Sequence, residues 1–310
     1  LASEFYAGVE EQVRGVLKSK MSDLLTRFEF EELWFKNIVL NSRFLPPTGH
    51  TGGAGATIAP YEVSLKGVPG VLVAAGPSLR QSLPLLRELK GRAFLLACDT
   101  AFKVMRRGDV LPHGVITLDA QPHTLFHFQG EDRLRECVMF ADLVSNPRVV
   151  RSLLPRVRKL SYSTTAQVRH AADGRLVRES TPGTEHAEAV HGPVGFIQSG
   201  GSVATSGFDL LRILGCDPII LIGQDLAYTG RHIHSAGTHH HEKWLTLLSR
   251  TRCLEHIVES VVRKRRTRPI PAVGGGEVLG DYVLDLYRMW FEQSIPTTDR
   301  RVINLTRPGA

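Results

Sequence analysis

Short, uninterrupted apolar runs alternate with helical patterns through much of the chain. Four runs have strand length and no polar alternation, which is typical of strands buried on both faces: Val71–Ala75, Phe94–Cys98, Val115–Leu118 and Pro218–Gly223. Helices are predicted between the first three of these, over Ser82–Lys90 with Ser82 as N-cap and over Ala101–Arg107. Strands that alternate with helices indicate an α/β fold with a parallel sheet and right-handed crossovers.

The N-terminal part of the chain has a different pattern. Apolar residues recur with a 3.6-residue period across Ser3–Asn41, which predicts a long helix. The stretch Pro46–Pro60 is rich in Gly, Thr and Pro and reads as a linker. We therefore expect residues 1–45 to form a helical arm, or the end of a truncated neighbouring domain, and residues 61–310 to form the α/β domain.

The second half of the chain predicts further helices. Ser202–Leu214 has a helical apolar face, with Gly215 as a C-cap candidate, and helices are also expected over residues 242–263 and 282–293. The polar, irregular stretch Ala171–Pro193 suggests a flexible excursion.

Composition narrows the class of protein. The 310 residues are 42% apolar and 22% charged, which is enough for a sizeable globular core. No apolar run approaches the ~20 residues of a membrane helix, so no membrane span is expected. The net charge of +7 favours an anionic ligand, and much of the excess lies in Arg263–Arg268. No basic stripe is interleaved with aromatic residues, so nucleic acid is not an expected partner.

The spacing of the cysteines and the first residues of the chain favour a cytoplasmic location. The four cysteines are widely spaced without a CxxC pair, which favours free thiols in a reducing cytoplasm over a zinc knuckle or disulfides. The first residues, Leu1–Glu4, lack the basic and apolar regions of a signal peptide. Because the chain does not start with Met, we expect that flanking segments are missing.

Polar clusters follow all four predicted strands. They are Gly76-Pro77-Ser78, Asp99-Thr100, Asp119-Ala120-Gln121 and Gly223-Gln224-Asp225. In an open parallel sheet, ligands bind beyond the carboxyl ends of the strands. Four such clusters at strand ends therefore predict a cleft that binds a nucleotide.

Two glycine-containing segments could contact phosphate. Gly76-Pro77-Ser78 reads as a turn into a helix, whose amides and Ser78 hydroxyl could bind phosphate, or as an ordinary turn. It fits neither GxGxxG nor a P-loop. Gly200–Gly207 opens the most regular helix, where Ser202 or Thr205 could donate to phosphate or ribose. Alternatively, its small residues pack closely on the sheet.

Acidic residues and histidines are the candidates for chemistry. Asp99, Asp119 and Asp225 could bind Mg²⁺ or ribose, or cap neighbouring turns. Five histidines follow the last predicted strand: His232, His234, His239, His240 and His241. They could be solvated loop residues, a zinc site, or the source of one general acid or base.

Four segments occur in an order that resembles a known family. They are Ala75-Gly76-Pro77-Ser78-Leu79, Val115–Asp119, Gly200–Ala204 and Ile219–Ala227 (IILIGQDLA), with Asn304-Leu305-Thr306 near the end. Over roughly Asn41–Leu305 the chain resembles the MptE-like domain of the motility-associated factor (Maf) proteins, which resemble bacterial sialyltransferases. The resemblance implies a Rossmann-like, GT-A-type fold. It also implies transfer of a pseudaminic- or legionaminic-type nonulosonic acid from a CMP-activated donor to Ser or Thr of flagellin.

The resemblance also implies roles for individual residues. Gly76, Pro77 and Ser78 would line the CMP phosphate and ribose, with Asp99, Thr100 and Asp119 in the same cleft. Gly201, Ser202 and Thr205 would contact cytidine or phosphate, and Gln224 with Asp225 would complete the pocket. Catalysis is assigned to His232, His234 and Asp225. The family often has Pro-Asp where this chain has Pro112-His113.

Two alternatives accompany this interpretation. Archaeal relatives of the domain are hydroxymethylpterin pyrophosphokinases, which use ATP and Mg²⁺ and would give the aspartates the larger role. The other alternative is a non-catalytic nucleotide-binding scaffold for flagellin. Mg²⁺ is possible but not required for the glycosyltransferase, and the oligomeric state is left open.

Overall fold

The computed structural model describes residues 2–45, 56–170 and 176–310. Twelve strands are present in these ranges: β1 (Ala56–Thr57), β2 (Gly70–Val73), β3 (Phe94–Cys98), β4 (Gly114–Thr117), β5 (Val138–Asp142), β6 (Lys159–His170), β7 (Leu176–Glu179), β8 (Phe196–Gln198), β9 (Ile219–Ile222), β10 (Arg268–Pro271), β11 (Glu277–Gly280) and β12 (Val302–Asn304).

Nine α-helices are present in the same ranges: α1 (Ala2–Ser42), α2 (Leu79–Leu89), α3 (Asp99–Arg107), α4 (Pro147–Leu153), α5 (Pro182–His191), α6 (Val203–Ile213), α7 (His239–Leu245), α8 (Leu254–Val262) and α9 (Tyr282–Ser294). Five short 3₁₀ segments connect them: η1 (Ala59–Tyr61), η2 (Pro122–His127), η3 (Arg133–Glu136), η4 (Thr229–Arg231) and η5 (Ile295–Thr297).

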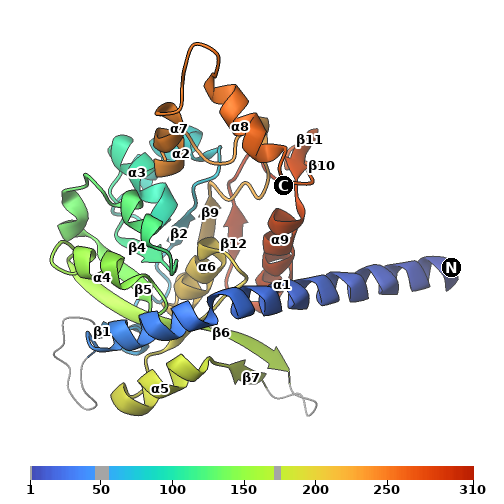
Figure 1. The fold of residues 1–310 in the computed structure, drawn as a ribbon. Helices are drawn as coiled ribbons and strands as arrows, with labels where there is room; N and C mark the ends of the chain where they lie inside the picture. Colours follow the sequence, from blue (N-terminus) through green and yellow to red (C-terminus); the bar gives the residue numbers. More distant parts are fainter. Residues whose placement is uncertain (1, 46–55, 171–175) are drawn as a thin grey trace.

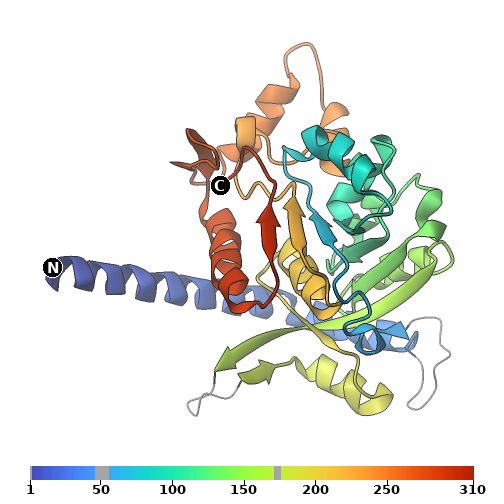
Figure 2. The same ribbon diagram turned by 180° about the vertical axis from the view of Figure 1, so that it is seen from behind.

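The central sheet is parallel along its whole main path, in the order β1-β6-β5-β4-β3-β2-β9-β12. Strands β7 and β8 pair with the far half of β6, and β10–β11 form a separate hairpin. Figures 1 and 2 show helices on both faces of the sheet and the helix α1 across it. The predicted α/β, Rossmann-like class is confirmed.

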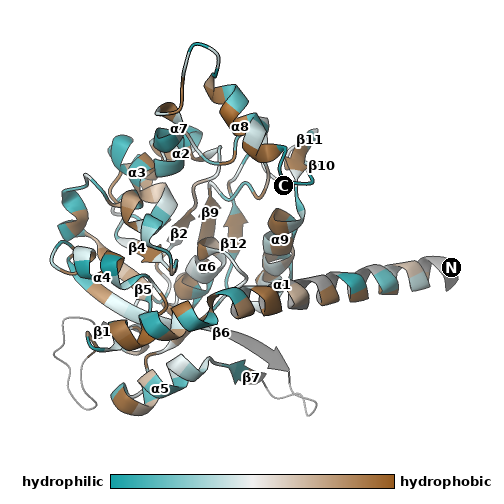
Figure 3. Ribbon diagram, in the orientation of Figure 1, coloured by the Kyte–Doolittle hydropathy of each residue, from teal (hydrophilic) through white to brown (hydrophobic). Residues whose placement is uncertain are grey.

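Alternate residues of the central strands face the two helical layers. Val71, Val73 and Leu95 pack with α2 and α3, and Leu72 and Leu96 pack with α6 and α9. Figure 3 shows apolar colouring along β9, which is consistent with a strand covered on both faces. The edge strand β12 is only partly buried.

The long helix α1 confirms the predicted N-terminal helix, and its C-terminal part packs on the α/β body. Asn37 donates to the carbonyls of Ala120 (3.2 Å) and Val144 (2.9 Å). Asn41 is fully buried and donates to the carbonyls of Leu143 (2.9 Å) and Ser145 (2.7 Å). Because these carbonyls lie in the loops after β4 and β5, α1 supports the edge where the polar clusters were predicted. Its N-terminal half extends away from the body (Figures 1 and 2).

Two predicted helices have wrong boundaries, and one segment that was expected to be irregular is regular. Helix α2 begins at Leu79, with Ser78 and not Ser82 at the N-cap position. The single helix predicted over 242–263 is two helices, α7 and α8, separated by a turn in which Ser249 and Arg252 form an isolated bridge. The expected flexible excursion is regular in its described part, residues 176–193, which forms β7 and α5. Residues 46–55 of the predicted linker lie outside the described residues.

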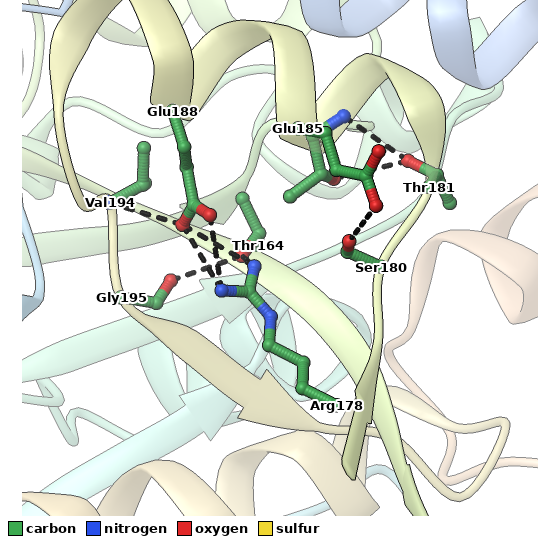
Figure 4. A network of polar contacts seen from close by, with 9 residues as sticks. Thr164, Arg178, Ser180, Thr181, Glu185, Glu188, Val194 and Gly195 are labelled. Atoms are coloured by element: carbon green, nitrogen blue, oxygen red, sulfur yellow. Dashed lines mark hydrogen bonds and ion pairs between the residues drawn. The ribbon is translucent and has the colours of Figure 1, made fainter.

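A polar network explains why that segment is regular (Figure 4). Arg178 of β7 forms an ion pair with Glu188 of α5 (3.1 Å) and donates to the Thr164 hydroxyl of β6 (3.0 Å). The Thr164 hydroxyl in turn donates to the carbonyl of Gly195 (3.2 Å). Thr181 caps α5 by accepting from the Thr184 amide (3.3 Å). The polar residues that suggested irregularity are therefore the ones that fix α5 on β6 and β7.

Among the described residues, no helix combines the length and the apolar character that crossing a bilayer requires.

We predict that Asn41→Ala lowers the free energy of unfolding by about 2–4 kcal/mol, because two buried carbonyls lose their donor. Urea unfolding followed by circular dichroism measures the change. Ser42→Ala is the matched control, since the Ser42 hydroxyl bonds only within its own helix, to Val39. Equal stability of Asn41→Ala and Ser42→Ala would contradict the assigned role of Asn41.

Candidate functional site

The site lies at the topological switch point of the sheet. From β2 the chain continues to β3 on one side, whereas β9 pairs with β2 on the other side. In open α/β sheets, the crevice at such a point, beyond the carboxyl ends of the strands, is the usual ligand position. The turns after β2 and β9 meet there, and they contain Gly76-Pro77-Ser78 and Gly223-Gln224-Asp225.

These two turns are joined by a buried carboxylate. Asp225 accepts from the Ser78 hydroxyl (2.7 Å) and the Ser78 amide (3.2 Å), and the Gly76 amide donates to the Gly223 carbonyl (2.8 Å). A Cβ at Gly76 would lie 2.0 Å from an Asp225 carboxylate oxygen, so this close approach requires glycine. Burial raises the pKa of Asp225, and the Ser78 hydrogen bonds oppose that rise.

The hydrogen bonds between Ser78 and Asp225 limit the access of a ligand to both residues. Asp225 occupies the anion position at the start of α2, where the sequence suggested phosphate. Ser78 and Asp225 are each 2% exposed. Both residues therefore position the crevice, and a phosphate would reach Ser78 only by displacing the carboxylate. Gln224 is also buried, and its backbone amide donates to the Thr306 hydroxyl (3.0 Å).

Asp99 and Asp119 lie at the ends of β3 and β4 and differ in accessibility. Asp99 is buried and accepts from the Thr117 hydroxyl (2.8 Å) and from the Thr100 amide (2.6 Å) and hydroxyl (3.1 Å). Burial raises its pKa. Asp119 is partly exposed, accepts from the Gln121 amide (2.8 Å) and contacts His123 Nε2 at 3.3 Å. Asp119 is therefore the carboxylate open to a ligand.

Ser202 and Thr205 form a capping box at the N-terminus of α6. The Ser202 hydroxyl accepts from the Thr205 amide (3.2 Å), and the Thr205 hydroxyl accepts from the Ser202 amide (3.3 Å). Thr205 is fully buried and also accepts from the Gly200 amide (2.9 Å). A Cβ at Gly200 would lie 2.3 Å from Trp290 of α9. Close packing against Trp290 accounts for glycine at position 200, and capping of α6 accounts for Thr205. Gly201 and Ser202 remain accessible to a ligand.

Histidines from three segments converge on this edge. His127 comes from η2, His234 from the loop after η4, and His239 and His240 from α7. The rings of His234 and His240 stack with centroids 5.4 Å apart, and His127 meets His240 edge-on at 5.6 Å. His234 forms a hydrogen bond to the backbone of Ala75 at the end of β2.

The cluster is neutral at physiological pH. Burial, followed by the charges of His240 and His127, lowers the pKa of His234 to about 4. Burial is likewise the largest cause that lowers the pKa of His127 to about 3, and it lowers the pKa of His240 against the opposing charges of Asp99 and Asp119. Because these imidazoles are uncharged, each has one ring nitrogen without a proton, which can accept a hydrogen bond or a proton from a ligand.

A family model described as 6-hydroxymethylpterin diphosphokinase MptE-like matches residues 54–231. The chain belongs to the MptE-like family. A protein of Treponema pallidum (strain Nichols), described as uncharacterized, is 25% identical over 114 residues, which are 36% of this chain and 50% of that protein. The chain thus spans about half the length of this curated relative.

The fold of this MptE-like chain is shared with a solved structure, that of the MAf glycosyltransferase from Magnetospirillum magneticum AMB-1. The TM-score is 0.55 at 15% sequence identity, and the match covers 90% of this chain and 38% of that one. The likeness establishes a common fold.

Two residues singled out in the MptE-like sequence lie apart from the site. His232 is exposed, and its charge acts on His241 and Glu255. His113, which replaces the acid of Pro-Asp, is at the start of β4, accepts from the Leu95 amide (3.0 Å) and stacks on Phe94. Because it is at the amino end of the strands, it takes no part in the site.

Sequence reasoning did not select His123 and His127. They follow Asp119 at intervals of four residues and lie in the 3₁₀ segment η2, which comes shortly after the end of β4. This H-x₃-H spacing after a strand-terminal acid was the available signal.

The carboxylates of this MptE-like site do not form a magnesium cage. Asp99 and Asp225 use their oxygens on neighbouring Thr and Ser groups. In the described part of the chain, no group of three or more His, Cys, Asp or Glu is placed to hold a metal ion.

We predict that acid destabilises this protein through its buried histidines. An unfolded imidazole has a pKa of 6.5 and His127 in the folded chain about 3, so between these values the unfolded state binds more protons. Stability therefore falls as pH drops below 6.5. His127→Phe removes this contribution. Between pH 7 and pH 5 its free energy of unfolding therefore falls by about 2 kcal/mol less than that of the wild type.

Urea midpoints at the two pH values test this prediction, with His232→Gln as the exposed control. Asp142, whose pKa burial raises to about 6, contributes the opposite slope, but it does so equally in each protein compared. The assignment fails if His127→Phe keeps the full pH dependence of the wild type.

Proposed function

We propose that this chain is a glycosyltransferase domain that transfers a nonulosonic acid from a CMP-activated donor to a Ser or Thr hydroxyl of flagellin. The observation that carries the proposal is the neutral His234, bonded to Ala75 at the switch point and stacked on His240. The shared fold with a protein described as a glycosyltransferase supports it. The donor, the sugar and flagellin as acceptor come from the sequence resemblance.

The proposed general base is His234. In a neutral imidazole only one ring nitrogen carries a proton, and we assign that proton to the nitrogen that faces the Ala75 backbone. The other nitrogen is then an acceptor for the proton of the acceptor hydroxyl. The hydroxyl oxygen bonds to the anomeric carbon as the bond from that carbon to the CMP phosphate oxygen breaks, and the proton passes to His234.

The remaining residues bind and position. Gly201 and Ser202, at the accessible start of α6, are assigned to the donor phosphate or cytidine, with Asp119 and Thr100 near the ribose. Ser78, Asp225, Gln224 and Thr205 hold the turns through buried hydrogen bonds, as does Asp99. Positioning of this kind supplies much of the rate in a reaction whose leaving group is already activated.

Nucleotide binding separates this proposal from its alternatives. We expect calorimetry of the chain with CMP, CDP and ATP, with and without Mg²⁺, to show CMP binding that needs no metal and weakens in Ser202→Ala. Tight Mg²⁺-dependent ATP binding without CMP binding would contradict the proposal and favour the diphosphokinase activity that the family description names. Binding of none of the three would favour a non-catalytic scaffold.

We predict that His234→Gln lowers kcat for CMP release from a CMP-activated nonulosonic acid in the presence of flagellin by about 10²–10⁴-fold with a small change in KM. His232→Gln, a matched change of an exposed residue two positions away, leaves kcat within about twofold.

The pH profile gives a second readout for the same base. Because the pKa of His234 is lowered to about 4, the wild-type kcat does not fall as pH drops through 6.5. A decline centred near 6.5, or equal rates for His234→Gln and His232→Gln, would exclude His234 as the base.

A further inference from the structure

A cavity lies between α2, α3 and α7, next to the loop that contains Ala236 and Gly237. Its volume is about 290 Å³, near the lower limit for small-molecule sites. Its apolar lining comes from Leu83, Val104 and Leu245. Its cationic lining comes from Arg80 and Arg107, with the imidazole of His241 beside them. Among the described residues that line it, none is acidic.

The two lining arginines come from separate helices and differ in their partners. Arg107 of α3 forms an ion pair with Glu242 and donates to the Gly237 carbonyl (3.1 Å). Glu242 also forms an ion pair with Lys103 (3.0 Å), so it compensates two cations. Arg80 of α2 is exposed and forms no hydrogen bond or ion pair with a described residue. The cavity therefore has an excess of positive charge.

The charges of Arg80 and Arg107 both act on His241. Burial lowers the pKa of His241, followed by the charges of His232, Arg107 and Arg80. Two guanidinium groups and an imidazole around one small space are suited to an oxyanion, because guanidinium N–H groups match phosphate and carboxylate oxygens in pairs. The apolar residues below them are suited to a compact hydrocarbon body.

We propose that this cavity is a second ligand site, which binds a small phosphate monoester with an apolar body through Arg80, Arg107 and His241. The site is distinct from the switch-point crevice and does not rest on the proposed glycosyl transfer. The two sites share a loop, because Ala236 and Gly237 line the cavity while the preceding His234 and Ser235 bond to Ala75 at the end of β2.

Titration calorimetry of the full chain with phenyl phosphate and inorganic phosphate at low salt tests the proposal. We expect phenyl phosphate to bind more tightly than inorganic phosphate, since only phenyl phosphate covers Leu83 and Val104. Arg80→Gln is expected to weaken phenyl phosphate binding about tenfold, the effect of one charge-assisted pair. Arg92→Gln, which removes an exposed arginine beyond the end of α2, leaves the affinity unchanged.

Two controls keep the result specific. Equal urea midpoints for Arg80→Gln and wild type show that the loss is not unfolding, and saturating CMP leaves phenyl phosphate binding intact. Displacement by CMP would assign the ligand to the switch-point crevice and overturn the proposal. Absence of binding up to about 10 mM, or equal affinity in Arg80→Gln and Arg92→Gln, would also overturn it.

Discussion

The bond between Asp225 and Ser78 is the constraint on which the site depends. It joins the turns after β2 and β9, which are far apart in sequence and adjacent at the switch point. Gly76 permits the approach because no Cβ intervenes. The carboxylate is buried at a helix start, where amide dipoles favour negative charge. The end of β2 is thereby fixed, and the Ala75 carbonyl there receives both the His234 ring and the Ser235 amide.

The histidine cluster shows how packing changes the chemistry of common residues. An exposed imidazole titrates near neutrality, but burial together with neighbouring imidazoles keeps this group uncharged well below that range. The cluster is held by α7, which is attached to α3 through the Lys103–Glu242 ion pair and to η2 through the stack of Phe126 on His239 at 4.7 Å. Proton-accepting groups are thus kept near Asp119 without a charge of their own.

The segment from His234 to His241 contributes residues to two different environments. His234 and His240 face the strand ends, whereas Gly237 and His241 face the groove between α2 and α3. A short segment therefore contributes to a neutral, proton-accepting site and to a cationic cavity. Glu242, in the first turn of α7, forms ion pairs with Lys103 and Arg107 of α3.

The sequence by itself determined the α/β class, the strands β2, β3, β4 and β9, the capped helix α6, and the strand ends that carry polar residues. Each of these follows from local patterns, since buried strands are apolar runs and the carboxyl ends of parallel strands share one edge. Tertiary structure decided the rest. The polar segment around Arg178 is regular only because Glu188 and Thr164 surround it. Likewise, His234 joined the site and His232 did not, because burial and charge depend on contacts between distant segments that no local pattern encodes.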